Sequence, residues 1–270
     1  MDKDRRLFER RVAKPRVREA KPEDIARLVE IDMECFQDVY EQNPKSADDI
    51  HEMLALRQGI AGNLMVVGEI DGQIEGFMTC LRTDKDHTQI TSWEETTNDG
   101  TLIDVHQPDG KNFYIVNLTT TGKGSEHNLS DQLIARLFGR LLEAQVEKAY
   151  LLSRIPQFSQ WTAARQINFE DLSEDEQDLL AETYTQATKI VDGKECFYDG
   201  MLRRYAESGA KPVAVLRDGY GDPASHDYSV LCVFENPLPD VLKKNHTLSV
   251  VAGYVVRRVA NHPKIIERLP

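Results

Sequence analysis

One strand of this chain runs into a loop of small residues that opens a helix, and this order limits what the chain can fold into. Residues 114–121 are rich in apolar and β-branched side chains, and residues 122–130 contain two glycines, two serines and an asparagine. The helix expected over 131–148 has apolar residues at helical spacing, namely Leu133, Ile134, Leu137, Leu141 and Leu142. N–H groups at a helix N-terminus lack intrahelical acceptors, so a pyrophosphate can bind there without a basic side chain. The segment predicts a phosphate-binding loop, with a plain strand-to-helix turn as the alternative.

Two common phosphate motifs do not fit this loop. A nucleotide P-loop needs a glycine, four residues and then Gly-Lys-Ser/Thr, and residues 122–125 have neither that order nor the upstream glycine. The dinucleotide-binding fingerprint of the Rossmann fold needs a third glycine, which does not follow Gly122 and Gly124 at the required spacing.

The segment resembles the acyl-CoA loop of the GNAT superfamily of acyltransferases, in which a strand runs into Gln/Arg-x-x-Gly-x-Gly/Ala and then a helix. With the helices in register, Ser125, Asn128 and Ser130 stand at the three motif positions, and all three depart from the usual residues. The resemblance implies that acetyl-CoA is the acyl donor and that no metal is needed. The residues it places against acetyl-CoA are Leu118, Thr119, Thr120, Ser125, Glu126, His127, Asn128, Leu129, Ser130 and Asp131.

The flanking sequence is similar to the same superfamily. Residues 16–20 predict a strand that turns into a helix with the apolar stripe Ile25, Leu28, Val29, Met33 and Phe36. A second helix is expected over 46–58, with Ser46 and Asp49 as a capping pair. A hairpin with an Asp-Gly turn is expected over 66–81, a glycine-stopped helix over 198–209 and a strand over 211–216. The resemblance implies an α/β fold of the GNAT type, with a mixed, mostly antiparallel sheet flanked by helices. We expect a basic tail at 1–16, the GNAT-like domain at 17–239 and a C-terminal extension at 240–270.

Longer motifs narrow the resemblance. Residues 92–100, 106–110, 153–158 and 220–225 look like a GNAT subgroup found as stand-alone bacterial proteins, as fusions to carbon-nitrogen hydrolases and as GNAT-like loading domains of polyketide synthases. The likeness spans roughly 17–239. It implies that the acceptor is either a small-molecule amine or the thiol of a carrier protein.

The resemblance also implies catalytic roles. Tyr205 stands four residues before Gly209, where many GNAT enzymes carry the tyrosine that protonates the departing thiolate. Backbone N–H groups around Leu118 to Thr120 would polarise the acyl carbonyl.

The insertion at 87–112 is long for a simple connection, and long ordered loops are often functional. Glu94, Glu95 and His106 of this insertion can accept the proton of an amine. Trp93 and Arg154 are candidates for acceptor binding, although a structural ion pair explains Arg154 equally well. Asp104 and His106 stand two residues apart, but two ligands do not define a metal site.

Composition excludes some partners. The formal net charge of −12 disfavours nucleic acid and anionic membranes, no apolar run is long enough to span a bilayer, and residues 1–16 lack the apolar segment of a signal peptide. The four cysteines are far apart and form no paired motif, which favours reduced residues of a cytoplasmic protein.

In the C-terminal extension, Leu248, Val251, Val255 and Val259 recur near helical spacing. We expect this stripe to dock on its own chain, with a homodimer as the alternative.

The sequence therefore predicts an acyl-CoA-dependent acyltransferase, most simply an N-acetyltransferase that uses acetyl-CoA and an unidentified amine. Two alternatives remain. One is S-acyl transfer or decarboxylative loading onto a carrier-protein thiol, and the other is a non-catalytic acyl-CoA-binding protein.

Overall fold

A computed structural model describes residues 15–217, 221–239, 243 and 245–260 of the chain, without the side chains of 257–260. The helices are α1 (Ile25–Cys35), α2 (Gln37–Gln42), α3 (Ala47–Ala61), α4 (Trp93–Thr97), α5 (Gly122–Glu126), α6 (Leu129–Glu143), α7 (Phe158–Ala164), α8 (Glu174–Thr185), α9 (Gly200–Glu207) and α11 (His246–Ala260). The strands are β1 (Arg16–Glu19), β2 (Met65–Ile70), β3 (Gln73–Thr83), β4 (Asn112–Thr120), β5 (Lys148–Arg154), β6 (Thr188–Val191), β7 (Lys194–Phe197), β8 (Lys211–Arg217) and β9 (Tyr228–Glu235).

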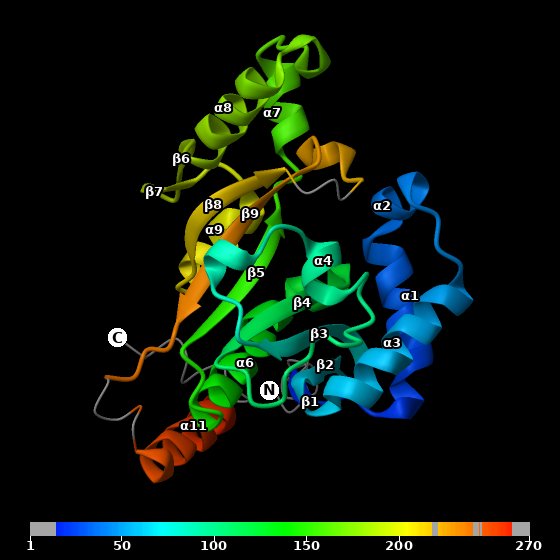
Figure 1. Ribbon diagram of the computed structural model, residues 1–270, viewed down its shortest axis with the longest axis vertical. Helices are drawn as coiled ribbons and strands as arrows, with labels where there is room; N and C mark the ends of the chain where they lie inside the picture. The colour runs from blue at the N-terminus through cyan, green and yellow to red at the C-terminus, as the bar shows by residue number, and fades with distance from the viewer. Residues whose placement is uncertain (1–14, 218–220, 240–242, 244, 261–270) are drawn as a thin grey trace, which may run out of the picture.

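Seven of these strands form one sheet in the order β1-β2-β3-β4-β5-β9-β8 (Figure 1). Every neighbouring pair is antiparallel except β4 and β5, which are parallel. This arrangement confirms the expected mixed, mostly antiparallel sheet flanked by helices. A parallel pair needs a crossover connection, and α6 supplies it by returning the chain from the end of β4 to the start of β5.

Side-chain alternation along β2 divides the core between the two faces of the sheet. Met65 and Val67 pack with α1 and α3, whereas Val66 belongs to the larger cluster that contains α6. The turn between β2 and β3 has Asp71 and Gly72 at φ 53° and 80°, the conformation that an Asp-Gly hairpin turn requires. Residues Ser46 and Asp49 cap α3 reciprocally, as the sequence predicts.

Several boundaries differ from the sequence prediction. The predicted loop at 122–130 contains the helical turn α5, and the helix predicted over 131–148 is α6, which begins at Leu129 and ends at Glu143. On α1, the predicted stripe is wrong at Met33, which is 40% exposed, whereas Asp32 is buried at 3%. A carboxylate therefore occupies a position on the inner face of α1.

The insertion between β5 and α9 carries elements that the sequence did not reveal. It forms α7, α8 and the separate β6–β7 hairpin, and its two helices lie beyond one end of the sheet (Figure 1). Phe158 stacks on Tyr184 with ring centroids 4.8 Å apart and meets Phe169 edge to face at 5.5 Å. This aromatic cluster joins the insertion to the main core, because Phe158 and Phe169 also meet Tyr228 of β9.

The last helix, α11, packs against α6 of the same chain. The face that docks differs from the predicted one. Ser249 and Gly253 are turned to α6, whereas Leu248, Val251 and Val255 are 47%, 54% and 51% exposed. A Cβ atom on Gly253 would lie 2.5 Å from the carbonyl oxygen of Gly139, so the two helices approach through small residues.

Candidate functional site

The sheet opens between β4 and β5. These strands pair only at Asn112–Lys148, Phe113–Ala149 and Tyr114–Tyr150, while β5 stays paired to β9 as far as Arg154. Beyond Tyr114, the side of β4 that faces β5 has no strand partner in the described part of the chain. An extended ligand can bind such an edge through backbone hydrogen bonds.

A β-bulge lies where the strands part. On the other side of β4, Ile115 is opposite Cys80 and Asn117 is opposite Thr79, so Val116 is the extra residue. The indole N–H of Trp93 in α4 donates to the carbonyl oxygen of Val116 at 2.8 Å. The insertion at 87–112 is thereby joined to the bulge, and the predicted site residue Trp93 lies there.

A cavity of about 410 Å³ lies over this bulge. Its walls come from α1, α2, α3, α4 and β4, and the residues that line it are Asp32, Phe36, Val39, Tyr40, Asn43, Lys45, Met53, Arg57, Trp93, Glu94, Asp99, Val116 and Asn117. Two of the residues predicted for the site, Trp93 and Glu94, are among them. The volume suits a small molecule or the acyl group and acceptor of a transfer reaction.

Ionisable side chains from separate elements converge on the cavity. Asp32 accepts a hydrogen bond from the phenol of Tyr40, and burial raises the pKa of Asp32. Burial also raises the pKa of Glu94, with a further contribution from Asp99. Carboxylates with raised pKa values are better matched to accepting a proton near neutral pH than ordinary ones.

The buried Arg57 joins three walls of the cavity. Its Nε donates to the carbonyl of Gly100, and its guanidinium lies 5.7 Å from the centre of the Trp93 ring and 3.5 Å from Oδ1 of Asn117. Neither Asp32 nor Arg57 was predicted as a site residue. Each continues a run of buried apolar positions, Ile25, Leu28 and Val29 on α1 and Ile50, Met53 and Leu54 on α3, at helical spacing. The sequence signal that could have identified both residues was a charged side chain on an otherwise apolar helix face.

At the far end of β4 lies the loop that the sequence predicts to bind an anion, called the cradle below. Asn128, at the position of the motif's first glycine, has φ 52° and ψ 37°. Glycine adopts this left-handed conformation freely and asparagine tolerates it, so the departure from the motif keeps its backbone geometry.

Only some of the predicted N–H donors remain available in the cradle. Those of His127, Asn128 and Asp131 donate to carbonyls three residues earlier at 3.1–3.2 Å. Leu129 and Ser130 begin α6, where a helix has no internal acceptor. Leu129 is completely buried and Ser130 is 4% exposed, so a ligand reaches these N–H groups only after neighbouring side chains move.

A basic side chain also reaches the cradle. Arg204 of α9 contacts Oγ of Ser130 through Nη1 and lies 3.8 Å from a carboxylate oxygen of Asp131. The sequence indicated that the helix N-terminus could bind an anion without a basic residue. The fold adds one, because α9 lies beside the start of α6.

Buried hydrogen bonds fix the approach to the cradle. Thr121 caps α5 by accepting from the N–H of Gly124 at 3.1 Å, and its hydroxyl donates to Glu75 of β3 at 2.8 Å. Ser125, at the first motif position, lies 3.0 Å from the hydroxyl of Thr120. The loop is therefore held before any ligand binds, which lowers the entropic cost of binding.

Tyr205 lies in the core beside Cys232, with 5% of its surface exposed. Burial raises the pKa of its phenol, which keeps the group protonated at neutral pH. A protonated phenol is the state that a proton donor needs, and Tyr205 also fills space between α9 and the sheet.

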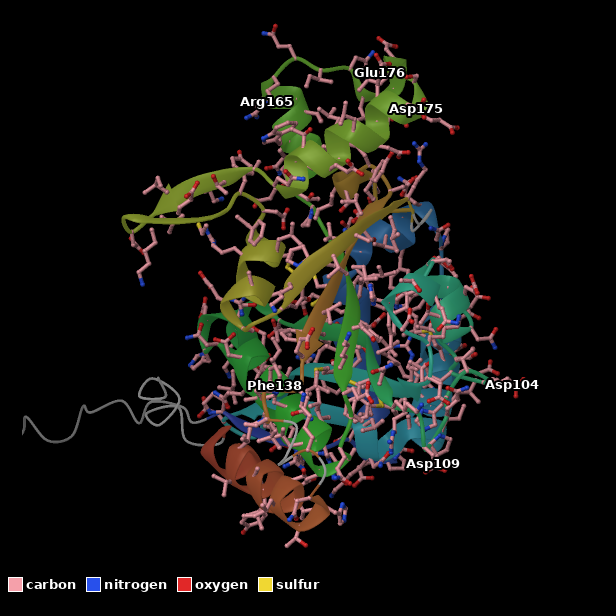
Figure 2. The ribbon with its side chains drawn as sticks, turned by 60° about the vertical axis from the view of Figure 1, so that its left-hand side comes forward. Asp104, Asp109, Phe138, Arg165, Asp175 and Glu176 are labelled. Carbon is pink, nitrogen blue, oxygen red and sulfur yellow. The ribbon has the colours of Figure 1, made fainter. Side chains whose placement is uncertain are left out.

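Two other predicted residues are held by structural contacts. Nδ1 of His106 accepts the backbone N–H of Arg82 at 3.2 Å, and His106 is not among the residues that line the cavity. Figure 2 places its neighbours Asp104 and Asp109 at the outer edge of the molecule. Burial and Arg82 lower the pKa of His106. Its catalytic role stays a prediction that these contacts do not support.

Arg154, predicted to bind an acceptor, forms a bidentate pair with Asp222 at 2.7 Å and a second pair with Asp38 of α2 at 2.5 Å. These contacts tie the end of β5 to α2. Glu95 is exposed and is not among the residues that line the cavity. It is ion-paired with Lys85 at 3.4 Å, and its hydrogen bond with Thr91 lowers its pKa.

Comparison with known proteins identifies the fold. No model of a known protein family matches the chain. The protein named "Uncharacterized N-acetyltransferase YkwB", from Bacillus subtilis (strain 168), is 23% identical over 224 residues, which cover 79% of this chain and 85% of that protein.

Two solved structures resemble the chain over most of its length. The loading GNATL domain of CurA from Lyngbya majuscula has a TM-score of 0.60 at 18% identity. The match covers 82% of this chain and 98% of the CurA domain. The GphF GNAT-like decarboxylase, solved in complex with isobutyryl-CoA, has a TM-score of 0.58 at 18% identity. The match covers 82% of this chain and 99% of the decarboxylase chain. The chain has the GNAT fold, as the sequence resemblance implied.

Proposed function

We propose that the protein is an acyl-CoA-dependent acyltransferase and that its simplest reaction is acetyl transfer from acetyl-CoA to an amine. The observation that carries this proposal is the arrangement along β4. The cavity lies at the bulge at Val116, and the anion cradle follows Thr121, about 16 Å farther along an extended strand. Among the described residues, no strand pairs with the edge of β4 between them on the β5 side. A donor with a pyrophosphate at one end and a thioester at the other fits this order.

The cradle supports binding of the pyrophosphate. The N–H groups of Leu129 and Ser130 and the guanidinium of Arg204 supply donors, and the α6 dipole favours negative charge there. The pantetheine arm would follow the open edge of β4, and N–H groups of Leu118 to Thr120 would polarise the acyl carbonyl.

The cavity supports a role in acceptor activation. An alkylamine is protonated in water and must lose a proton before its nitrogen can attack the thioester. Asp32 and Glu94 face the cavity with raised pKa values, and we propose them as the proton acceptors. The C–N bond forms as the C–S bond breaks, and Tyr205 returns a proton to the thiolate of CoA.

A second candidate is transfer to, or decarboxylative loading of, a carrier-protein thiol. The likeness to the GNATL domain of CurA and to the GphF decarboxylase favours it, since both have TM-scores near 0.6 over nearly their whole length. A thiol acceptor carries no cationic group, so the carboxylates of Asp32 and Glu94 in the cavity lining favour the amine.

The compartment we propose is the cytoplasm. All four cysteines are unpaired with one another, and burial raises the pKa of Cys80 and Cys232. Among the described residues, no helix is long and apolar enough to cross a membrane.

Thermal unfolding with acetyl-CoA, followed by a thiol-release assay, tests the proposal. At about 100 times Kd, a ligand that binds only the folded state adds about 2.7 kcal/mol of stability, so we expect Tm to rise by roughly 5 °C. Thiol release should then require an amine in a panel that also holds carrier proteins. Binding without release on any acceptor would favour a non-catalytic acyl-CoA binder, and no binding would exclude both functions.

A further inference from the structure

The outer face of α11 is an apolar surface on a helix that is already docked. Twelve large apolar side chains are well exposed in the described part of the chain, and five of them lie on this helix: Leu248, Val250, Val251, Tyr254 and Val255. The residues turned to α6, Ser249 and Gly253, lie on the opposite side of the helix. Monomeric proteins rarely expose apolar side chains in such a cluster, which is typical of an interaction surface.

The docking of α11 is specific, so this exposure belongs to a fixed helix. Asn245 caps its start by accepting the N–H of Leu248 at 3.1 Å. Gln145, just after α6, donates to the carbonyl of Lys243 at 2.6 Å and lies 3.2 Å from the ring of His246. The contact of Gly253 with Gly139 sets how closely the two helices approach. The apolar face is therefore held outward by contacts on the inner face.

The spacing of the exposed residues favours a helix as the occupant. Leu248, Val251 and Val255 follow steps of three and four residues, which form the seam of a two-helix packing. A seam of this kind can pack against an identical helix across a two-fold axis.

Charge favours a second copy of this chain at this place. The chain has a net charge of −12, so two copies repel each other over most of their surfaces. Residues 246–256 contain no Asp, Glu, Lys or Arg, so they add no like-charge repulsion and offer nothing to select an oppositely charged partner. In Figures 1 and 2, α11 lies at one extremity of the molecule, away from α7 and α8, where a second copy can approach.

We infer that the exposed face of α11 is the centre of a two-fold homodimer interface, in which Leu248, Val251 and Val255 of two copies pack together. A helix of 15 residues is about 22 Å long, and standard interfaces bury about 800 Å² on each partner. One helix covers only part of that area. The dimer should therefore dissociate on dilution, and it should form whether or not acetyl-CoA is bound.

Sedimentation equilibrium from about 1 μM to roughly 200 μM, the range in which a small interface dissociates, tests this inference. The parent chain should change from monomer to dimer as its concentration rises. The double variant Val251→Glu and Val255→Glu should stay monomeric with unchanged Tm, because both side chains face solvent in the monomer. Leu179→Glu is the matched control, since Leu179 is 64% exposed on a helix far from α11, and it should dimerise like the parent.

Three results would overturn the inference. One is a parent that stays monomeric throughout the range, and another is a folded double variant that still dimerises. The third is a parent that is monomeric but associates after removal of residues 1–14 or 261–270, since the chain's own terminal segment would then be the occupant of this face.

Discussion

Replacing Arg204 by Met tests the cradle directly, because this side chain brings positive charge to the start of α6. In the free protein, Arg204 is about a third exposed and lies 3.8 Å from a carboxylate oxygen of Asp131. An ion pair with this exposure contributes about 0–1 kcal/mol to folding, so the free energy of unfolding should change little. Hydrogen bonds to charged groups contribute about 1.5–3 kcal/mol. Arg204 must give up its contact with Asp131, which costs about 0–1 kcal/mol of that gain. About 0.5–3 kcal/mol then remains for the pyrophosphate, so Kd should weaken roughly 2- to 150-fold.

Isothermal titration calorimetry separates this effect from general damage. Acetyl-CoA should bind Arg204→Met weakly, whereas S-acetyl-pantetheine, which lacks the pyrophosphate, should bind parent and variant alike. Arg203→Met is the matched control, because the neighbouring Arg203 lies 4.0 Å from the sulfur of Cys196 and not at the cradle. Equal acetyl-CoA affinity for Arg204→Met and the parent, or an equal loss in both variants, would refute the role of Arg204.

Substitutions at three further positions test the cradle loop, the cavity and the leaving group. Asn128→Gly should keep both Tm and acetyl-CoA affinity. Asn128→Val places a β-branched residue at φ 52° and should lose about 1–2 kcal/mol of stability in thermal unfolding. Equal stability of the two variants would contradict the left-handed conformation at this position. Burial raises the pKa of Asp32, so the stability that Asp32 contributes is complete below its ordinary pKa and is lost as pH rises through the raised pKa. The Tm of Asp32→Asn should therefore rise relative to that of the parent between about pH 4 and pH 8. A Tm difference that does not change with pH would argue against the raised pKa. Tyr205→Phe should lower kcat by roughly 100-fold with little change in Tm, and a kcat within about threefold of the parent would remove Tyr205 from the mechanism.

Much of the sheet could be predicted because its signals are local. The Asp71-Gly72 turn, the capping pair of Ser46 and Asp49, and the positive φ at Gly209 each depend on a few adjacent residues, and each occurs where the sequence predicts it. The register of β3 against β4 depends on pairing between distant segments. The bulge at Val116, which places the cavity, therefore had no local signal.

The site was predicted less completely, because its residues meet through packing. Trp93 and Glu94 were predicted and line the cavity, whereas Asp32 and Arg57 reach it from helices that had been interpreted as purely structural. Arg204 was missed because it lies 74 residues from Ser130 in sequence, and only the packing of α9 beside α6 brings them together. The stripe on α11 is apolar as predicted, but the sequence did not show which face of α11 docks on α6. The close approach of Gly253 to Gly139 depends on both helices and leaves no signal in either one alone.

A structure of the protein with bound acetyl-CoA would show whether the donor lies along β4. We predict the pyrophosphate over the backbone N–H groups of Leu129 and Ser130 beside Arg204. We also predict the pantetheine arm along β4 and the thioester at the bulge of Val116, facing the cavity that Asp32 and Glu94 line. Acetyl-CoA bound elsewhere on the fold, or a cradle without phosphate while binding is saturated, would contradict this prediction.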